Sequence, residues 1–431
     1  MNRFLPTLLV LLPAVTDVAA TPPPADLGAF LEEAENKSPA LRAAMARLEA
    51  LRRTPSQARA LPDPEVGLAY TNDGLSGFTL GDSEFSNLAL TWRQEVPYPG
   101  KRGQAGEVAE ESARISETDY ERVRLEVASA VKVAYADLYR LDRAAAFLDE
   151  ARLALDILVE GARSRYEVGS GVQESILKAQ TEVLKLEAER ARVTGERRGV
   201  EARLNAILGR ADQGSIGEVV ILPPAGLPED PGALEETAIA ASPLVAGLQA
   251  AARRAESRAR LARLDMKPDF IWSGSYVNRD GLDPMVMGMF GLKLPLYRGR
   301  KQAQALLQAE SESTAARQDL ADLQLRTRAS VRELVARFQR ADRLVTLYGQ
   351  GVVPQAKSTL ESARASYAVG RLPFLDLLTD TVIVLEARIT LAAEESERLQ
   401  ALAALEPLLA RELIHVPADS GPEGDSHDAV R

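Results

Sequence analysis

Apolar side chains recur at helical spacing along residues 100–165, a stretch that is nearly free of proline. This period predicts one continuous helix, about 100 Å long at 1.5 Å per residue. A second helix is expected to return antiparallel over residues 172–208, because glycines at 169–171 allow the left-handed backbone at which a helix ends. The same pair is predicted again at 299–367 and 373–409. The positions that show the period in the first helix are Val123, Leu125, Val127, Ala130, Val131, Ala134 and Leu138.

Glycines stand within both long helices, well before the turns. Gly349 and Gly351 in the second helix predict a break or a shift of register at that point. Gly161 occupies a similar place in the first helix and predicts a similar interruption there.

Four shorter segments alternate apolar and polar residues with a period of two. These expected strands lie near residues 64–72, 86–96, 268–278 and 285–295. Strands of about ten residues with one apolar, aromatic-bearing face are typical of transmembrane barrels. An alternative is a small soluble sheet that packs its apolar face on the helices. On the barrel interpretation, lipid-facing positions include Trp92, Phe270, Trp272 and Phe290.

The chain is a tandem repeat in which each half reads helix, strand, strand, long helix, turn, helix. The segment "VPYPGKR" at 96–102 corresponds to "LPLYRGRK" at 294–301, and "LNAILGR" at 204–210 corresponds to "LEPLLAR" at 405–411. Ordered landmarks at a nearly constant offset indicate internal duplication. The expected divisions are a signal peptide at 1–20, a first repeat at 21–210, a linker or equatorial segment at 211–232, a second repeat at 233–411, and a disordered acidic tail at 412–431.

The N-terminus has the features of an export signal. A single cation at Arg3 precedes an apolar core, and small residues follow at the expected cleavage site. The chain has no cysteine, which excludes disulfides, thiolate metal sites and a lipid anchor on cysteine. A formal net charge of −10 argues against nucleic acid as a partner, because binding phosphates requires a basic surface.

Four strands are too few to close a barrel around a channel. Open strand edges are not tolerated in lipid, where every backbone polar group needs a partner. If the strands span a membrane, several protomers must share one barrel, and three protomers with four strands each would supply twelve. The long helices would then continue the barrel as a tube of coiled helices. The predicted fold class is therefore mainly α with a small β part.

The duplicated turns "RYEVG" at 165–169 and "SYAVG" at 366–370, together with the landmarks above, resemble the TolC-like outer-membrane efflux channels. The resemblance covers about residues 30–411. It implies a homotrimer with a twelve-stranded barrel in outer-membrane lipid and a periplasmic helical tunnel. The implied partners are a periplasmic adaptor (membrane fusion) protein and an inner-membrane pump of the RND type. The segment "RQEVPYPGKR" at 93–102 is most similar to the heavy-metal efflux branch.

The two turns are candidate contacts for the adaptor. In a trimer they would place six turns around the mouth of the tunnel, which suits six adaptor hairpins. Tyr166 with Gly169, and Tyr367 with Gly370, would shape those turns. The alternative is that the glycines only end helices and the tyrosines only pack on their neighbours.

The second turn is followed by two candidate aperture residues. The resemblance implies an inward carboxylate near this point, and Asp376 matches it by its distance from Gly370. Asp380 lies one helical turn further on the same face. Three copies would form an acidic ring that attracts cations, whereas the alternative is a solvated carboxylate at a helix start. Leu372 stands where TolC itself has a latching arginine, which puts the latch in doubt.

No catalytic, cofactor or phosphate-binding motif is present in the sequence, so a passive conduit is expected rather than an enzyme. A metal site formed by His427 with Asp425 and Asp428 would lack any enforced geometry. The sequence leaves the cargo open, with metal cations as one candidate. Two alternative functions remain, namely a soluble periplasmic coiled-coil adaptor or scaffold and the outer-membrane component of a type I protein secretion system.

Overall fold

The computed structural model describes residues 25–74, 77, 80, 85–169, 171–211, 214–223, 226–227 and 231–414. The expected signal peptide, all but the first three residues of the expected acidic tail, and His427 with its two aspartates lie outside the described residues. The first half contains α1 (Leu27–Lys37), α2 (Pro39–Arg52), α3 (Thr54–Arg59), β1 (Glu65–Thr71), β2 (Asn87–Val96), α4 (Lys101–Glu167) and α5 (Gln173–Leu208). The second half contains α6 (Pro231–Ala241), α7 (Pro243–Leu264), β3 (Asp269–Asn278), β4 (Met285–Lys293), α8 (Gln302–Leu347), the π-helix η1 (Tyr348–Val352), α9 (Val353–Ala368) and α10 (Phe374–Leu409).

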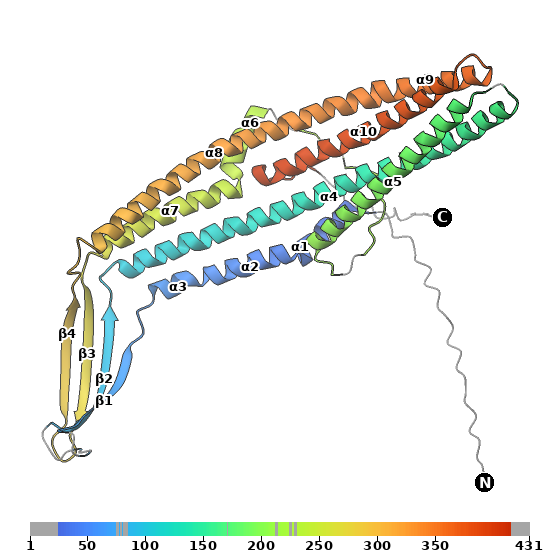
Figure 1. Ribbon diagram of the computed structural model, residues 1–431. Coiled ribbons are helices and arrows are strands. Elements are labelled where there is room, and N and C mark those ends of the chain that lie inside the picture. The colour runs from blue at the N-terminus through green and yellow to red at the C-terminus, as the bar shows by residue number, and fades with distance from the viewer. Residues whose placement is uncertain are drawn as a thin grey trace, which may run out of the picture.

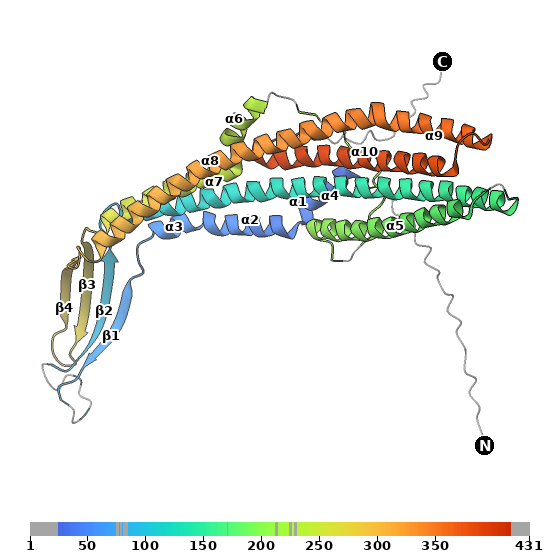
Figure 2. The same ribbon diagram turned by 45° about the horizontal axis from the view of Figure 1, so that its top comes forward.

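The molecule is elongated, with long helices side by side and one small sheet beyond their ends (Figure 1). Both halves follow the predicted order of helix, strand, strand, long helix, turn and helix. The turn between α4 and α5 and the turn between α9 and α10 both lie at the end opposite the sheet (Figure 2). The duplicated sequence therefore places its repeated turns together in space.

The sheet joins the two repeats. Its strand order is β1-β2-β3-β4, and every neighbouring pair is antiparallel. It extends away from the helices rather than lying on them, and its apolar face is exposed, with Val286 at 80% of its full accessibility. The alternative of a soluble sheet packed on the helices is therefore wrong for this protomer.

The long helices differ at their internal glycines. Residues Tyr348–Val352, which include Gly349 and Gly351, form a π-helical turn between α8 and α9. This confirms the predicted shift of register, because a π turn inserts an extra residue into the helical ladder. Gly161 causes no such break, and α4 runs through it as one helix of 67 residues. The second expectation was wrong because a glycine lowers helix propensity only modestly within a helix that packs along its length.

The strands meet the helices at a junction built from both repeats. Gly100 adopts a φ of 95° and stands just before α4. Beside it, Lys101 is largely buried, and its Nζ lies 2.8 Å from a carboxylate oxygen of Asp269 in β3. The same oxygen accepts a hydrogen bond from the backbone N–H of Tyr98. The landmark "VPYPGKR" thus fixes the first repeat to the start of β3 in the second.

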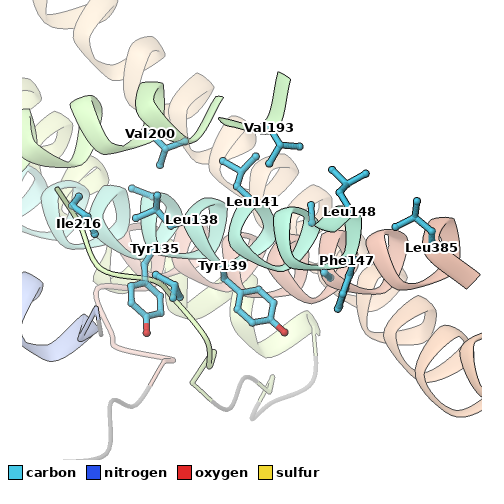
Figure 3. Packing of buried hydrophobic residues seen from close by; sticks show 14 of the residues in the cluster. Tyr135, Leu138, Tyr139, Leu141, Phe147, Leu148, Val193, Val200, Ile216 and Leu385 are labelled. Atoms are coloured by element: carbon cyan, nitrogen blue, oxygen red, sulfur yellow. The ribbon is translucent and has the colours of Figure 1, made fainter. Parts of the chain in front are cut away.

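The core runs along α4, which packs against α5, α7 and α10. Figure 3 shows Leu138, Leu141 and Leu148 of α4 beside Val193 and Val200 of α5. Further along, buried leucines of α10 pack on α6 and α8. Apolar faces at helical spacing thus bury themselves between helices, and the sheet contributes little to this core.

One buried ion pair crosses the interface between the two repeats. Nζ of Lys132 in α4 lies 2.6 Å from Oε2 of Glu406 near the end of α10, and both side chains are buried. The other carboxylate oxygen, Oε1, accepts hydrogen bonds from the backbone N–H groups of Leu413 and Ile414. The pair therefore ties α4 to α10 and to the segment that follows it.

Candidate functional site: hairpin turns and sheet faces

The two hairpin turns are built alike around a glycine. Gly169 has a φ of 75° and Gly370 a φ of 73°, values that side chains with a Cβ adopt only with strain. Each glycine donates its N–H to the carbonyl of the tyrosine three residues earlier, at 2.9 Å from Tyr166 and 3.0 Å from Tyr367. No neighbouring atom would obstruct a Cβ at either glycine, so the backbone angle alone requires glycine.

The two turns are also joined to each other by an arginine. Arg165 of α4 donates a hydrogen bond of 3.0 Å to the backbone carbonyl of Tyr367. Its guanidinium lies 4.0 Å from the centroid of the Tyr367 ring, a cation–π arrangement. The same ring meets Phe374, at the start of α10, edge-on at 6.0 Å. Arg165 thus connects the end of α4 to the turn between α9 and α10.

Sequence reasoning missed Arg165, although a signal was present. The turns align as "RYEVG" and "SYAVG", so the arginine stands where the other repeat has Ser366. The difference has a structural counterpart in the tyrosines. Tyr166 is exposed, whereas Tyr367 is half-buried between Arg165 and Phe374. The two predicted turn tyrosines therefore differ in surroundings, and only Tyr166 offers an open surface in the protomer.

The two candidate aperture residues lie in the first turns of α10. Asp376 is exposed, and Asp380, one turn later, is half-buried. Leu377 and Val384 are buried against α9, and Asp380 lies one helical turn before Val384, at the edge of this buried face. In the protomer, Asp376 is therefore open to solvent, whereas Asp380 is partly covered.

A groove of about 1270 Å³ lies between α5 and α10 close to the turns. Its floor is apolar, with Leu148 of α4, Leu186 of α5 and Leu378 of α10. Its rim is charged with both signs and is formed by Lys178, Glu182, Lys185, Glu189 and Glu386. An apolar floor with a charged rim suits an amphipathic helix.

The sheet has one strongly apolar face. The register places Trp92 of β2 opposite Val66, and Trp272 of β3 opposite Phe290 of β4. Trp92, Trp272 and Phe290 are exposed, whereas Phe270 is half-buried and stacks between Tyr98 and Phe290. All four predicted lipid-facing residues share this face. Its other large apolar members are Val66, Leu68, Tyr70, Leu88, Leu90, Val96, Tyr276, Val286 and Leu292.

The opposite face of the sheet, called the polar face below, carries the charged residues and most of the hydroxyl groups of the strands, together with small residues and the larger apolar Ile271, Val277, Met285, Met287 and Met289. Close to the helices it carries two ion pairs, Lys293 with Glu95 at 2.7 Å and Arg93 with Glu65 at 3.4 Å. Farther from the helices it carries Thr91 level with Ser275. A sheet with one apolar face and one polar face is suited to stand between lipid and water.

Within the described residues, two further kinds of site can be compared with the sequence, a membrane-spanning helix and a metal cluster. In the described part of the chain no helix is both long enough and apolar enough to cross a bilayer. The described residues also contain no group of three or more His, Cys, Asp or Glu side chains that could hold a metal ion.

The sequence matches the family model described as outer membrane efflux protein over residues 30–210 and again over 234–411. The chain belongs to this family. The two matches fall on the two repeats, so each half carries the family's pattern independently. No curated protein shows significant sequence similarity to the chain.

Solved outer-membrane channels share the fold of this efflux protein. VceC from Vibrio cholerae has a TM-score of 0.75 at 22% identity, covering 89% of this chain and 95% of its own. CmeC from Campylobacter jejuni has a TM-score of 0.72 at 14% identity, covering 95% and 94%. CusC, described as forming a transmembrane channel, has a TM-score of 0.76 at 15% identity, covering 89% and 92%.

Family membership settles the coarse function. This efflux protein is an outer-membrane channel component whose helices belong to the periplasmic side, and it is a conduit rather than an enzyme. The predicted fold class and the predicted family are confirmed. The alternative of a soluble periplasmic adaptor or scaffold is wrong, because the family match covers the strands as well as the helices.

Replacing both turn glycines by valine is expected to impair export while leaving outer-membrane insertion intact. Each valine would hold a left-handed backbone at a cost of about 1 kcal/mol or more, so both turns would change shape. The measurement is efflux-dependent resistance in cells, with the amount of protein in the outer-membrane fraction as the second readout. Gly195→Val on α5, where nothing obstructs a Cβ and φ is helical, is the control. Normal export by the double variant would show that the turns are not part of the functional surface.

Proposed function

We propose that three copies of this chain form one efflux channel with a shared barrel of twelve strands, four from each copy. The observation that carries this proposal is the sheet with two open edges. In the described part of the chain, β1 pairs only with β2, and β4 pairs only with β3. An apolar sheet in lipid must close its edges, and pairing β4 of one copy with β1 of the next closes them.

The channel is proposed to work as the outer part of a tripartite system. A periplasmic adaptor would dock on the two turns and in the groove between α5 and α10, and an inner-membrane pump of the RND type would supply energy and cargo. The location of both turns at one end supports this arrangement, because three copies would surround the mouth with six turns (Figure 2). The apolar floor and charged rim of the groove suit a helical hairpin of the adaptor.

Metal cations are proposed as the cargo class. The sequence "RQEVPYPGKR" at 93–102, which is similar to the heavy-metal efflux branch, supports this cargo class. The ion-paired, polar inner face of the sheet is compatible with the passage of cations. A type I protein secretion system could use the same architecture, so the cargo has to be identified by transport.

Reconstitution tests the proposed channel. Purified protein added to planar bilayers is expected to give discrete conductance steps, each from one trimer. A matched sample unfolded by heat in denaturant controls for detergent artefacts. Insertion without any conductance, under applied potential and with adaptor present, would contradict the proposed function.

Replacing Asp376 and Asp380 by asparagine is expected to reduce cation selectivity and block by trivalent cations. The change keeps side-chain size but removes two negative charges from each protomer, and acidic rings attract cations at a narrow pore. The measurement is the reversal potential across a salt gradient in planar bilayers. Asp319 and Asp322 provide a matched control when changed to asparagine, because they lie in the first half of α8, before the π-helical turn and α9 that precede the second hairpin turn. Unchanged selectivity in the first variant would show that Asp376 and Asp380 do not line a constriction and are carboxylates of a solvated helix face.

A further inference from the structure

Methionine is concentrated on one face of one strand. The chain has six methionines, and three of them, Met285, Met287 and Met289, alternate along β4. Alternate residues of a strand point to the same side. Val286, which lies between the first two methionines, and Phe290, which follows the third, belong to the apolar face on the other side. The three methionines therefore lie on the polar face of the sheet.

The register shows what surrounds these thioethers. Met287 is paired with Ser275 and Met289 with Ser273, and Thr91 of β2 is level with Ser275, whereas Met285 is paired with Val277. The three methionines are 42%, 51% and 64% exposed, in chain order. Methionine usually fills irregular gaps in a core, and an exposed row in which Met287 and Met289 lie beside hydroxyl groups has no such role. The lipid-facing side also does not explain it, because that is the opposite face.

Thioether sulfur is a soft ligand that selects Cu(I) and similar ions over hard cations. Successive methionines on one face are about 7 Å apart along the strand, and their unbranched side chains can bring two sulfurs to one ion. Closer to the helices, the charged groups of this face are already paired as Lys293 with Glu95 and Arg93 with Glu65. The thioethers are thus the soft ligands of the outer half of this face.

We propose that Met285, Met287 and Met289 form a ladder of weak binding sites for soft monovalent cations on the barrel wall. The inference rests on the proposed function, because only a closed barrel turns this face into the wall of a pore. No electron transfer is involved, since the ion enters and leaves in one oxidation state. Neutral thioethers with few partners hold an ion weakly enough to release it, which suits conduction along several sites. In a trimer the ladder would be present three times.

Silver(I) is the probe, because it has soft-ligand chemistry and does not change oxidation state in air. Detergent-solubilised protein is dialysed against silver nitrate in chloride-free buffer, and bound silver is measured. The test variant carries Met285→Leu, Met287→Leu and Met289→Leu, which keeps size and apolarity but removes the sulfurs. Met45→Leu on α2 is the matched control, because Met45 is exposed but lies away from the sheet. Zinc(II) tests selectivity for soft ions.

The parent and the Met45 variant are expected to bind silver at micromolar concentrations, and the triple variant at least tenfold more weakly. Silver is also expected to block conductance of the parent in planar bilayers but not of the triple variant. Equal silver binding by all three proteins would overturn the inference. A conducting parent channel that silver never blocks would overturn it too, while leaving the proposed function intact. Absence of all conductance would count against the proposed function. The amount of silver bound in dialysis would then still show whether Met285, Met287 and Met289 bind soft cations.

Discussion

Replacing Lys132 by methionine is expected to lower the free energy of unfolding of the helical part by about 3–5 kcal/mol, the typical loss when one partner of a buried ion pair is removed. The side chains of Lys132 and Glu406 are only 2% and 4% exposed. Methionine fills a similar volume but leaves the carboxylate of Glu406 buried without its cation. The same carboxylate holds the backbone of Leu413 and Ile414, so the segment after α10 should loosen as well.

A double variant separates the charge from the packing. Lys132→Met combined with Glu406→Gln removes both charges but keeps an oxygen that can accept the two backbone N–H groups. It is expected to recover most of the loss, because replacing both partners of a buried pair is often close to neutral. The measurement is the urea midpoint of helix loss by far-UV circular dichroism. A single variant as stable as the parent would show that the pair contributes nothing at this interface.

Replacing Trp272 by arginine is expected to destabilise membrane insertion by about 2–4 kcal/mol, the penalty for a cation near the middle of the lipid-facing side of a barrel. Trp272 lies near the centre of β3, and its ring is 5.0 Å from that of Phe290. Arginine at this position would place its charge on the apolar face, next to Phe290 of β4 and with Gln94 of β2 on its other side. Outer-membrane abundance and the fraction of heat-resistant oligomer should both fall sharply.

The matched control places the same charge on the other face. Ser275→Arg lies three residues further along β3, level with Thr91 and Met287 on the polar side. This variant is expected to insert normally, because its charge would meet water inside the barrel. Equal abundance and oligomer stability for Trp272→Arg and Ser275→Arg would show that the faces have been assigned the wrong way round.

Local patterns predicted the fold well because its elements are long and regular. The start and end of α4 follow from Gly100 and Gly169, and both turn glycines adopt the left-handed backbone that the sequence implied. The tandem repetition of the sequence also predicted the order of helices and strands in each half. The predicted interruption at Gly161 was wrong, because the packing of α4 along its length stabilises the helix more than one glycine destabilises it.

The long-range contacts could not be predicted in the same way. Lys132 and Glu406 are 274 positions apart, and nothing in either local pattern indicates that they meet. Arg165 differs from its counterpart Ser366 in the other repeat, which marks it as unusual but does not identify Tyr367 as its partner. The surroundings of the β4 methionines could be identified only from the strand register, because the register shows that they share a face with Ser273 and Ser275.

Strand pairing between copies tests the central claim most directly. The chain has no cysteine, so introduced pairs react without background. One cysteine at Ala69 of β1 is combined in turn with one cysteine at each position of β4 from Met287 to Gly291, and outer membranes are oxidised. A cysteine at Thr91 of β2, a strand paired on both sides, replaces Ala69 as the control. The account predicts covalent products from at least one β1–β4 pair that stop at three chains, because the ring is then closed. Monomers alone, or a ladder that continues beyond three chains, would contradict it.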